Sequence, residues 1–171
     1  MRPPPPVIRL EPFTDADLPL LVALNAPEMT EHLGGPETDE QLRTRLERYV
    51  AAAASESVYA NKVILLPEAA AVGDVNLWER EWQGEPVYEM GWGILPSYQG
   101  RGIASAAVAA AVELARSLGR RQAVHAFPNV ANGPSNAVCR KAGFALRGPV
   151  DFEYPKGHWM RCNDWRLQLN A

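Results

Sequence analysis

Cysteine is scarce in this chain: only Cys139 and Cys162 occur, and they form no C-x-x-C pair. Two isolated cysteines are typical of reduced thiols in a cytoplasmic protein, and they exclude a disulfide-rich secreted scaffold. The three histidines, His32, His125 and His158, are scattered and show none of the spacings that mark zinc sites. The sequence therefore does not indicate a metal site.

Long apolar runs and an excess of positive charge are also missing. No hydrophobic stretch approaches the ~18 residues that a membrane-spanning helix needs, so we expect no membrane partner. The net charge is −3, whereas nucleic-acid binding requires a basic face, so we expect no nucleic-acid partner.

Composition and length indicate one globular domain. Of the 171 residues, 47% are hydrophobic and 22% are charged, which are globular values. Residues 1–6 contain Met-Arg followed by four prolines and are expected to form a loose, extended leader. We expect residues 7–171 to form a single domain, because no internal repeat or linker divides them.

Periodicity predicts a mixed α+β domain in the order β-α-α-β-β-β-α-β-α-β-β. The expected strands are 7–12, 58–66, 70–78, 88–95, 122–127, 144–147 and 158–169, and the expected helices are 14–25, 38–54, 103–118 and a short one ending at 143. The polar segment 79–85 is expected to be a loop. The third helix is expected to turn Ile103, Ala107, Ala110 and Leu114 towards the sheet.

The segment from Tyr88 to Ala104 carries the most specific signal. A strand is followed by Pro96, which ends it, then by the turn Gln99-Gly-Arg-Gly102 and by a helix. Backbone amides at such a helix start bind anions, aided by the helix dipole. The Walker lysine is absent, and Pro96 stands where the dinucleotide fingerprint needs its third glycine, so ATP or NAD binding is disfavoured.

The pattern that does fit is Q-x-x-G-x-A, at Gln99, Gly102 and Ala104. It resembles the pyrophosphate-binding motif of the GNAT superfamily of acyl-CoA N-acyltransferases. Taken alone, it also fits an ordinary helix start with a flexible turn.

A second block lies about thirty residues further on, with Asn132 and Ser135 followed by Lys141, Gly143 and Phe144. It is similar to the other superfamily signature, N-x-x-S followed by K-x-G-F, although alone it also fits a capped helix. The two blocks together, in this order, indicate the superfamily. The segment 27–35 further resembles the branch that contains the ribosomal-protein alanine N-acetyltransferases.

The resemblance implies an α+β fold whose central, mostly antiparallel mixed sheet is splayed between the fourth and fifth strands and flanked by helices. It implies acetyl-CoA as co-substrate and transfer of its acetyl group to a primary amine, by direct attack in a ternary complex. The acceptor is either a protein or peptide N-terminus or a small amine, and the chain is either a monomer or a homodimer. The implied cofactor-binding residues are Ile94, Gln99, Gly100, Arg101, Gly102, Ile103, Ala104, Asn132, Ser135 and Lys141.

Catalysis requires an oxyanion donor and a base. A backbone N–H of Ile94 or Leu95 is the expected donor, and such a donor contributes ~3–4 kcal/mol. Glu89 is the candidate base, because it shares a strand face with Gly91 and Gly93, which should leave open space above them. A role as a surface strand residue is the alternative for Glu89.

The general acid is less well defined. Many members of the superfamily have a tyrosine seven positions after the motif's asparagine, where this chain has Cys139. The Cys139 thiol is one candidate acid, a small buried residue is the other interpretation, and Ser135 or Tyr98 are substitutes. The missing tyrosine leaves open an alternative function, a catalytically weak or inactive acyl-CoA-binding sensor or interaction module.

Two further features are assigned to the acceptor. The loop from Met29 to Gly35 is expected to act as a lid. Trp78, Trp82 and Trp92 either wall the acceptor pocket or, for Trp92 at least, pack in the core.

Overall fold

A computed structural model describes residues 1–55 and 57–170. In this part of the chain a seven-stranded sheet has the order β1-β2-β3-β4-β5-β7-β6. Its strands are β1 (Val7–Pro12), β2 (Val58–Leu66), β3 (Ala70–Trp82), β4 (Glu85–Ile94), β5 (Ala123–Ala126), β6 (Ala145–Glu153) and β7 (Trp159–Gln168). Neighbouring strands are antiparallel except β4 and β5, which are parallel. The predicted mixed sheet is therefore confirmed.

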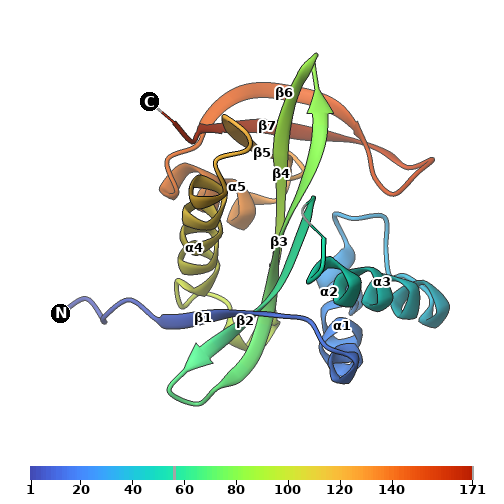
Figure 1. Ribbon diagram of the computed structural model, residues 1–171, viewed down its shortest axis with the longest axis vertical. Coiled ribbons are helices and arrows are strands. Elements are labelled where there is room, and N and C mark those ends of the chain that lie inside the picture. Colours follow the sequence, from blue (N-terminus) through green and yellow to red (C-terminus); the bar gives the residue numbers. More distant parts are fainter. Residues whose placement is uncertain (56, 171) are drawn as a thin grey trace.

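Helices cover both faces of the sheet. They are α1 (Leu18–Leu24), α2 (Pro27–Thr30), α3 (Asp39–Ala52), α4 (Ile103–Leu118) and α5 (Gly133–Lys141). Helices α4 and α5 lie on one side of the long central strands, and α1 to α3 lie on the other (Figure 1). The predicted capping box at Thr38 is present, since its side chain accepts from the Gln41 amide and the Gln41 side chain accepts from the Thr38 amide.

The main core lies between α4 and the sheet. The residues of α4 that are buried are Ile103, Ala107, Val108, Ala111, Val112 and Ala115. The buried face of α4 differs in part from the predicted one. Ile103 and Ala107 are buried as predicted, whereas Ala110 and Leu114 are only half-buried. Small alanine side chains along the contact line let the helix approach the strands closely.

A second core joins α1 and α3 to the opposite face of the sheet. Leu20 and Leu21 of α1 pack with Leu42 and Leu46 of α3 around Phe13. Full burial of a leucine or phenylalanine contributes about 1.5–3 kcal/mol, so this cluster stabilises the packing of α1 and α3 on the sheet, where α3 contacts β2 and α1 contacts β3.

The prediction of a loop at 79–85 was wrong. Strand β3 continues to Trp82 and β4 begins at Glu85, so the connection is only Gln83-Gly84. Both residues have positive φ, 51° and 81°, as a two-residue hairpin of type I′ requires. Polar residues on both faces of this hairpin remove the apolar alternation that would indicate a strand in the sequence. Strand β6 extends to Glu153, beyond the predicted 144–147. It is an edge strand whose residues are mostly exposed, so the sequence lacks the apolar alternation that would indicate a strand.

The sheet opens between β4 and β5. These strands pair only at Tyr88 with Val124 and at Glu89 with His125. Beyond Glu89 the side of β4 that faces β5 has no strand partner among the described residues. The split ends beside the turn that leads into α4, and this geometry positions the candidate site.

Candidate active site

The glycine turn has the backbone geometry of an anion cradle. Gly100 and Gly102 have φ values of 75° and 80°, which L-residues with a side chain rarely adopt. Gly102 is the N-cap of α4, and the first intrahelical bond runs from the Ala106 amide to the Gly102 carbonyl, 3.1 Å. The amides of the first turn, including Ile103 and Ala104, therefore have no acceptor within the helix.

The side chain of Gln99 ties this turn to β4. Its Nε2 donates to the Ile94 carbonyl at 2.9 Å and lies 3.6 Å from Sδ of Met29. The neighbouring Arg101 is exposed, with its guanidinium 5.5 Å from the ring centre of Tyr98. Gln99 thus holds the end of the split strand against the cradle, while Arg101 stays accessible.

Of the two backbone donors expected at the end of β4, Ile94 and Leu95, the structure favours Ile94. The Leu95 amide already donates to the Val72 carbonyl of β3 at 2.8 Å, so the assignment of Leu95 is corrected. Amides alternate in direction along a strand, and therefore the Ile94 amide points away from β3 towards the split. The Ile94 side chain is buried in the core.

The second sequence block forms α5 as predicted. Asn132 is the N-cap, and its side chain accepts from the Ser135 amide at 3.2 Å. Gly143 follows the helix with a φ of 90°. Ser135 is half-buried and Lys141 is exposed in the last turn. The helix cap agrees with the capped helix that this block also fits, and the cofactor role of Asn132 remains a prediction.

Cys139 is not suited to act as an acid. Its side chain is fully buried in the core cluster on the α4 side of the sheet. Burial raises the pKa of the Cys139 thiol to about 12, because the thiolate loses its hydration. We therefore correct the acid role to the alternative interpretation, a small buried core residue.

Sequence reasoning missed Asn136, which organises the loop before α5. Its Nδ2 donates to the carbonyls of Asn129 and Asn132 at 3.0 and 2.7 Å, and its Oδ1 accepts from Asn163 and Trp165 at 2.9 and 2.8 Å. This buried amide links β7 to the loop after β5. Only the three-dimensional contacts distinguish it from an ordinary helix residue.

Glu89 is buried rather than free over an open strand face. Its carboxylate forms an ion pair with Arg80 of β3. Burial raises the Glu89 pKa, and the Arg80 hydrogen bond and charge oppose that rise. The expected open space is narrow: a Cβ on Gly91 would stand 3.3 Å from the Trp78 ring, and one on Gly93 would stand 3.4 Å from Asp74 Oδ1.

A buried polar network continues from Glu89 across the sheet. His125, its partner on β5, has its Nδ1 2.6 Å from Oδ1 of Asp164, whose Oδ2 accepts from Trp82 Nε1 at 3.1 Å. The Arg80 guanidinium lies 5.2 Å from the ring centres of both Trp82 and Phe152. Trp82 therefore packs at the turn end of the β3–β4 hairpin, whereas Trp92 packs against the main core.

Asp74 is the second site residue that the sequence did not reveal. It lies on β3 opposite Gly93 and accepts from Asn76 Nδ2 at 3.0 Å. Burial raises its pKa to about 6, while the Asn76 and Gly93 hydrogen bonds and the Arg45 charge oppose the rise. On sequence alone, Asp74 and Asn76 alternate with apolar residues and look like a solvent face. The packing of α1 to α3 turns that face into an interior.

The expected lid lies over the end of β4. Cε of Met29 and Cδ2 of Leu24 would each be 3.5 Å from a Cβ on Gly93. Gly34, further along the segment, lies against Pro155 and His158 in the turn between β6 and β7. The segment is partly helical, because α2 occupies its beginning. Its outer end is therefore packed against the β6–β7 turn.

Arg45 of α3 also connects this side of the molecule to the turn between β6 and β7. It pairs with Glu37 at 2.5 Å and donates to the hydroxyls of Tyr49 and Tyr154 at 3.0 and 3.2 Å. Tyr154 belongs to the turn after β6, so Arg45 joins α3 to the far hairpin. The Tyr49 hydroxyl also accepts from Asn76 at 3.4 Å, which continues the chain of contacts to Asp74.

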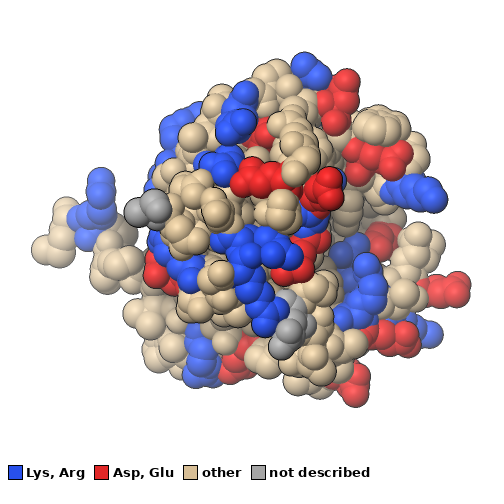
Figure 2. Space-filling model, turned by 45° about the horizontal axis from the view of Figure 1, so that its top comes forward, with Lys and Arg blue, Asp and Glu red and all other residues tan. Residues whose placement is uncertain are grey.

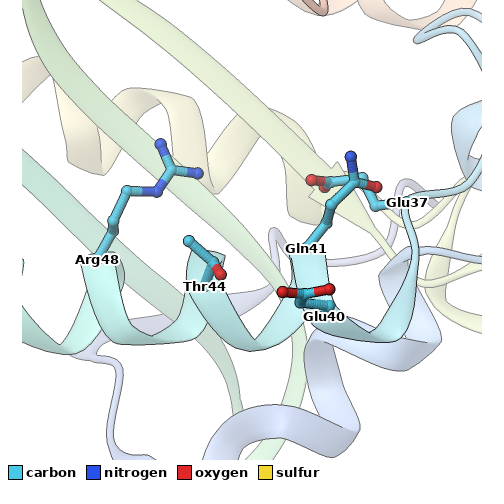
Figure 3. A pocket seen from close by; sticks show the side chains of 5 residues that line it. All are labelled: Glu37, Glu40, Gln41, Thr44 and Arg48. Atoms are coloured by element: carbon cyan, nitrogen blue, oxygen red, sulfur yellow. The ribbon is translucent and has the colours of Figure 1, made fainter.

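A hollow elsewhere on α3 is lined by Glu37, Glu40, Gln41, Thr44 and Arg48 (Figure 3). It includes no residue of the glycine turn, β4 or α5, and we assign it no role.

Basic and acidic side chains are interspersed on the face shown in Figure 2. Among the described residues no group of three or more metal-ligating side chains occurs, and no helix there is long and apolar enough to cross a membrane.

A sheet split beside a glycine cradle at a helix N-terminus is the arrangement that the resemblance to the N-acyltransferases implies. Residues 8–145 match the acetyltransferase (GNAT) domain family, so the chain belongs to that family. It is 32% identical over 103 residues to the uncharacterized N-acetyltransferase YnaD of Bacillus subtilis, an alignment that covers 60% of this chain and only 56% of the relative.

Many solved structures share the fold, among them two that differ in what they act on or bind. An acetyltransferase from Salmonella typhimurium that modifies the N-terminal serine of a 50S ribosomal subunit protein has a TM-score of 0.80 at 20% identity, over 95% of both chains. Spermidine N-acetyltransferase from Vibrio cholerae, in complex with CoA and spermine, has a TM-score of 0.77 at 16% identity, also over 95% of both chains.

Proposed function

We propose that this protein transfers an acetyl group from acetyl-CoA to a primary amine, either a peptide N-terminus or a small amine. The observation that carries the proposal is the split between β4 and β5, which ends beside the cradle of Gly100 and Gly102. The two structural relatives support the same chemistry, since one modifies a protein N-terminus and the other was solved with CoA and a polyamine.

The residues of the cradle fit the phosphates of CoA. Amides of the first turn of α4 lack intrahelical acceptors and point out of the helix start, where the dipole favours anions. Gly100 and Gly102 carry no side chain that would keep a phosphate away. Arg101 and Lys141 are exposed and would add positive charge at the rim.

The reaction proceeds by direct attack of the amine on the thioester. The Ile94 amide donates to the thioester oxygen as negative charge develops on it, and a preorganised donor of this kind contributes about 3–4 kcal/mol. A proton then reaches the departing thiolate from Ser135, Tyr98 or water. The buried Cys139 thiol does not take part.

The absence of a tyrosine at Cys139 favours a second candidate, an acyl-CoA-binding sensor or interaction module with little turnover. One assay separates the two functions. Thiol release from acetyl-CoA is followed with a panel of peptides with different N-termini, polyamines and aminoglycosides, and products are examined by mass spectrometry. We expect amine-dependent thiol release and a singly acetylated product. Tight binding of acetyl-CoA without any amine-dependent release would favour the sensor.

A further inference from the structure

We propose that Asp74 holds the ammonium group of the acceptor beside the split end of β4 and takes up its proton. This assignment rests on the proposed acetyl transfer and identifies a residue that acts on the acceptor. It also makes Glu89 a structural residue, held by Arg80.

Asp74 lies next to the proposed oxyanion donor at the end of β4. Asp74 pairs with Gly93 across the β3–β4 ladder, and its Oδ1 lies 3.4 Å from where a Cβ of Gly93 would stand. Because Gly93 has no side chain, the carboxylate borders the strand backbone directly. The next residue is Ile94, whose amide faces the split. The proposed oxyanion donor and Asp74 are therefore adjacent in the sheet.

Asp74 also differs from the neighbouring carboxylates in its partners. The other buried or half-buried carboxylates of β3 and β4 all have a basic partner: Glu79 pairs with Arg121, Glu85 with Arg166 and Glu89 with Arg80. Asp74 forms no ion pair with any described residue and accepts instead from the neutral Asn76 amide. A half-buried anion without its own cation is stabilised by a cationic ligand.

The surroundings of Asp74 suit proton transfer. The charged and titratable groups that face it are Lys62 on β2, which is held by Asp17, and Arg45 and Tyr49 on α3. Tyr154, from the turn after β6, reaches it only through Arg45. Burial raises the Asp74 pKa to about 6. The group is therefore ionised near neutral pH and is a stronger base than an ordinary aspartate.

The step balances without any other reactant. An ammonium nitrogen gives one proton to Asp74, and its lone pair then forms the C–N bond at the thioester carbon. The C–S bond breaks, and sulfur leaves with the bonding electrons and is protonated to free CoA. A second proton lost from nitrogen as the amide forms balances the proton that sulfur takes up, and Asp74 releases the first proton to solvent.

Binding of two CoA conjugates tests the assignment without knowledge of the natural acceptor. S-aminoethyl-CoA carries an ammonium group near the position of the attacking nitrogen, and S-hydroxyethyl-CoA is its neutral counterpart. Calorimetry at about pH 8 should show that the unmodified protein prefers the ammonium conjugate by roughly 10–100-fold, the range of a charge-assisted hydrogen bond. In Asp74→Asn this preference should disappear, while affinity for the neutral conjugate stays within about threefold.

Two other variants make the result specific. Glu85→Gln removes a carboxylate from the same sheet face and should keep the preference. Glu89→Gln tests the rival base and should also keep it. A preference that survives in Asp74→Asn, or is lost in Glu89→Gln instead, would overturn the assignment to Asp74.

The unmodified protein supplies an independent measurement that needs no variant to fold. Its preference for the ammonium conjugate should fall as the pH drops through about 6, the pKa of Asp74, while affinity for the hydroxyl conjugate changes little. A preference that does not change from about pH 8 to 5 would contradict the proposal. Failure of both conjugates to bind would instead remove the proposed cofactor site, and the Asp74 assignment with it.

Discussion

The carboxylate of Asp74 lies over the backbone of Gly93, with Oδ1 3.4 Å from the position that a Cβ would take. Gly93→Ala would place a methyl group in ordinary contact with Asp74, Leu24 and Met29, at 3.4–3.5 Å. We therefore expect the variant to fold, with a melting temperature within about 3 °C of the parent.

The same methyl group fills the space in which the acceptor nitrogen would meet Asp74. Steady-state kinetics should show a several-fold or greater rise in KM for the amine, with KM for acetyl-CoA little changed. An equal rise in both constants would place the effect of Gly93→Ala on the cofactor rather than on the acceptor.

Gly102→Ala should weaken acetyl-CoA binding at least tenfold. The left-handed φ of 80° at Gly102 is unfavourable for alanine by roughly 1–2 kcal/mol, and the new methyl group stands at the cradle. Gly119→Ala is the matched control, because Gly119 caps the other end of α4 with a φ of 62° and open space around it. Both variants should lose similar stability, and calorimetry should detect lost affinity only in the first. Equal acetyl-CoA affinities of the two variants would exclude the glycine turn as the cofactor-binding cradle.

Asp74→Asn should stabilise the folded protein at high pH. Folding raises the pKa of Asp74 from 3.8 to about 6, so the folded state binds this proton more tightly than the unfolded chain. Ionised Asp74 therefore destabilises the fold increasingly as the pH rises from about 4 to 6, and fully above that. Denaturation at about pH 8 should show that Asp74→Asn gains about 1–2 kcal/mol, after allowance for partial exposure.

The gain should shrink towards zero near pH 4, where the parent carboxyl is protonated in both states. If the gain in unfolding free energy is the same at both pH values, removal of the ionisable Asp74 carboxyl is not its cause. Stabilisation together with loss of acceptor binding is the pattern expected of a residue retained for function.

Cys139→Ala should keep most of the activity. The fully buried Cys139 thiol has a pKa raised to about 12 by burial, so it cannot protonate a leaving thiolate efficiently near neutral pH. We expect kcat within about threefold of the parent and a loss of roughly 1 kcal/mol in unfolding free energy from the small cavity. A fall in kcat of more than tenfold, with the fold intact, would restore Cys139 as the general acid.

Local signals in the sequence predicted the parts of the site that depend on backbone conformation. Gly102 and Gly143 precede and follow helices at positions that need positive φ, and Asn132 caps α5, as the capped-helix interpretation of its block requires. The mostly antiparallel mixed sheet followed from the family resemblance rather than from composition, and its strand order came only from the structure. The same resemblance predicted the splay, which the short pairing of β4 with β5 confirms.

Features that depend on packing between distant segments could not be predicted. The Gln83-Gly84 hairpin was concealed by polar residues, and its stability comes from contacts such as Trp82 to Asp164. The role of Asp74 depends on α1 to α3 closing over the sheet. The choice between the Ile94 and Leu95 amides depends on the bond from Leu95 to the Val72 carbonyl. In each case the decisive partner is far away in the sequence.

The most direct test of the central claim is the melting temperature with and without acetyl-CoA, with NADH and ATP as comparators. A ligand at a hundred times its Kd stabilises by about 2.7 kcal/mol, or roughly 5–10 °C for a domain of this size. We predict a shift of that order with acetyl-CoA and little change with NADH or ATP. No shift with acetyl-CoA, or an equal shift with all three ligands, would contradict an acetyl-CoA site in the split between β4 and β5.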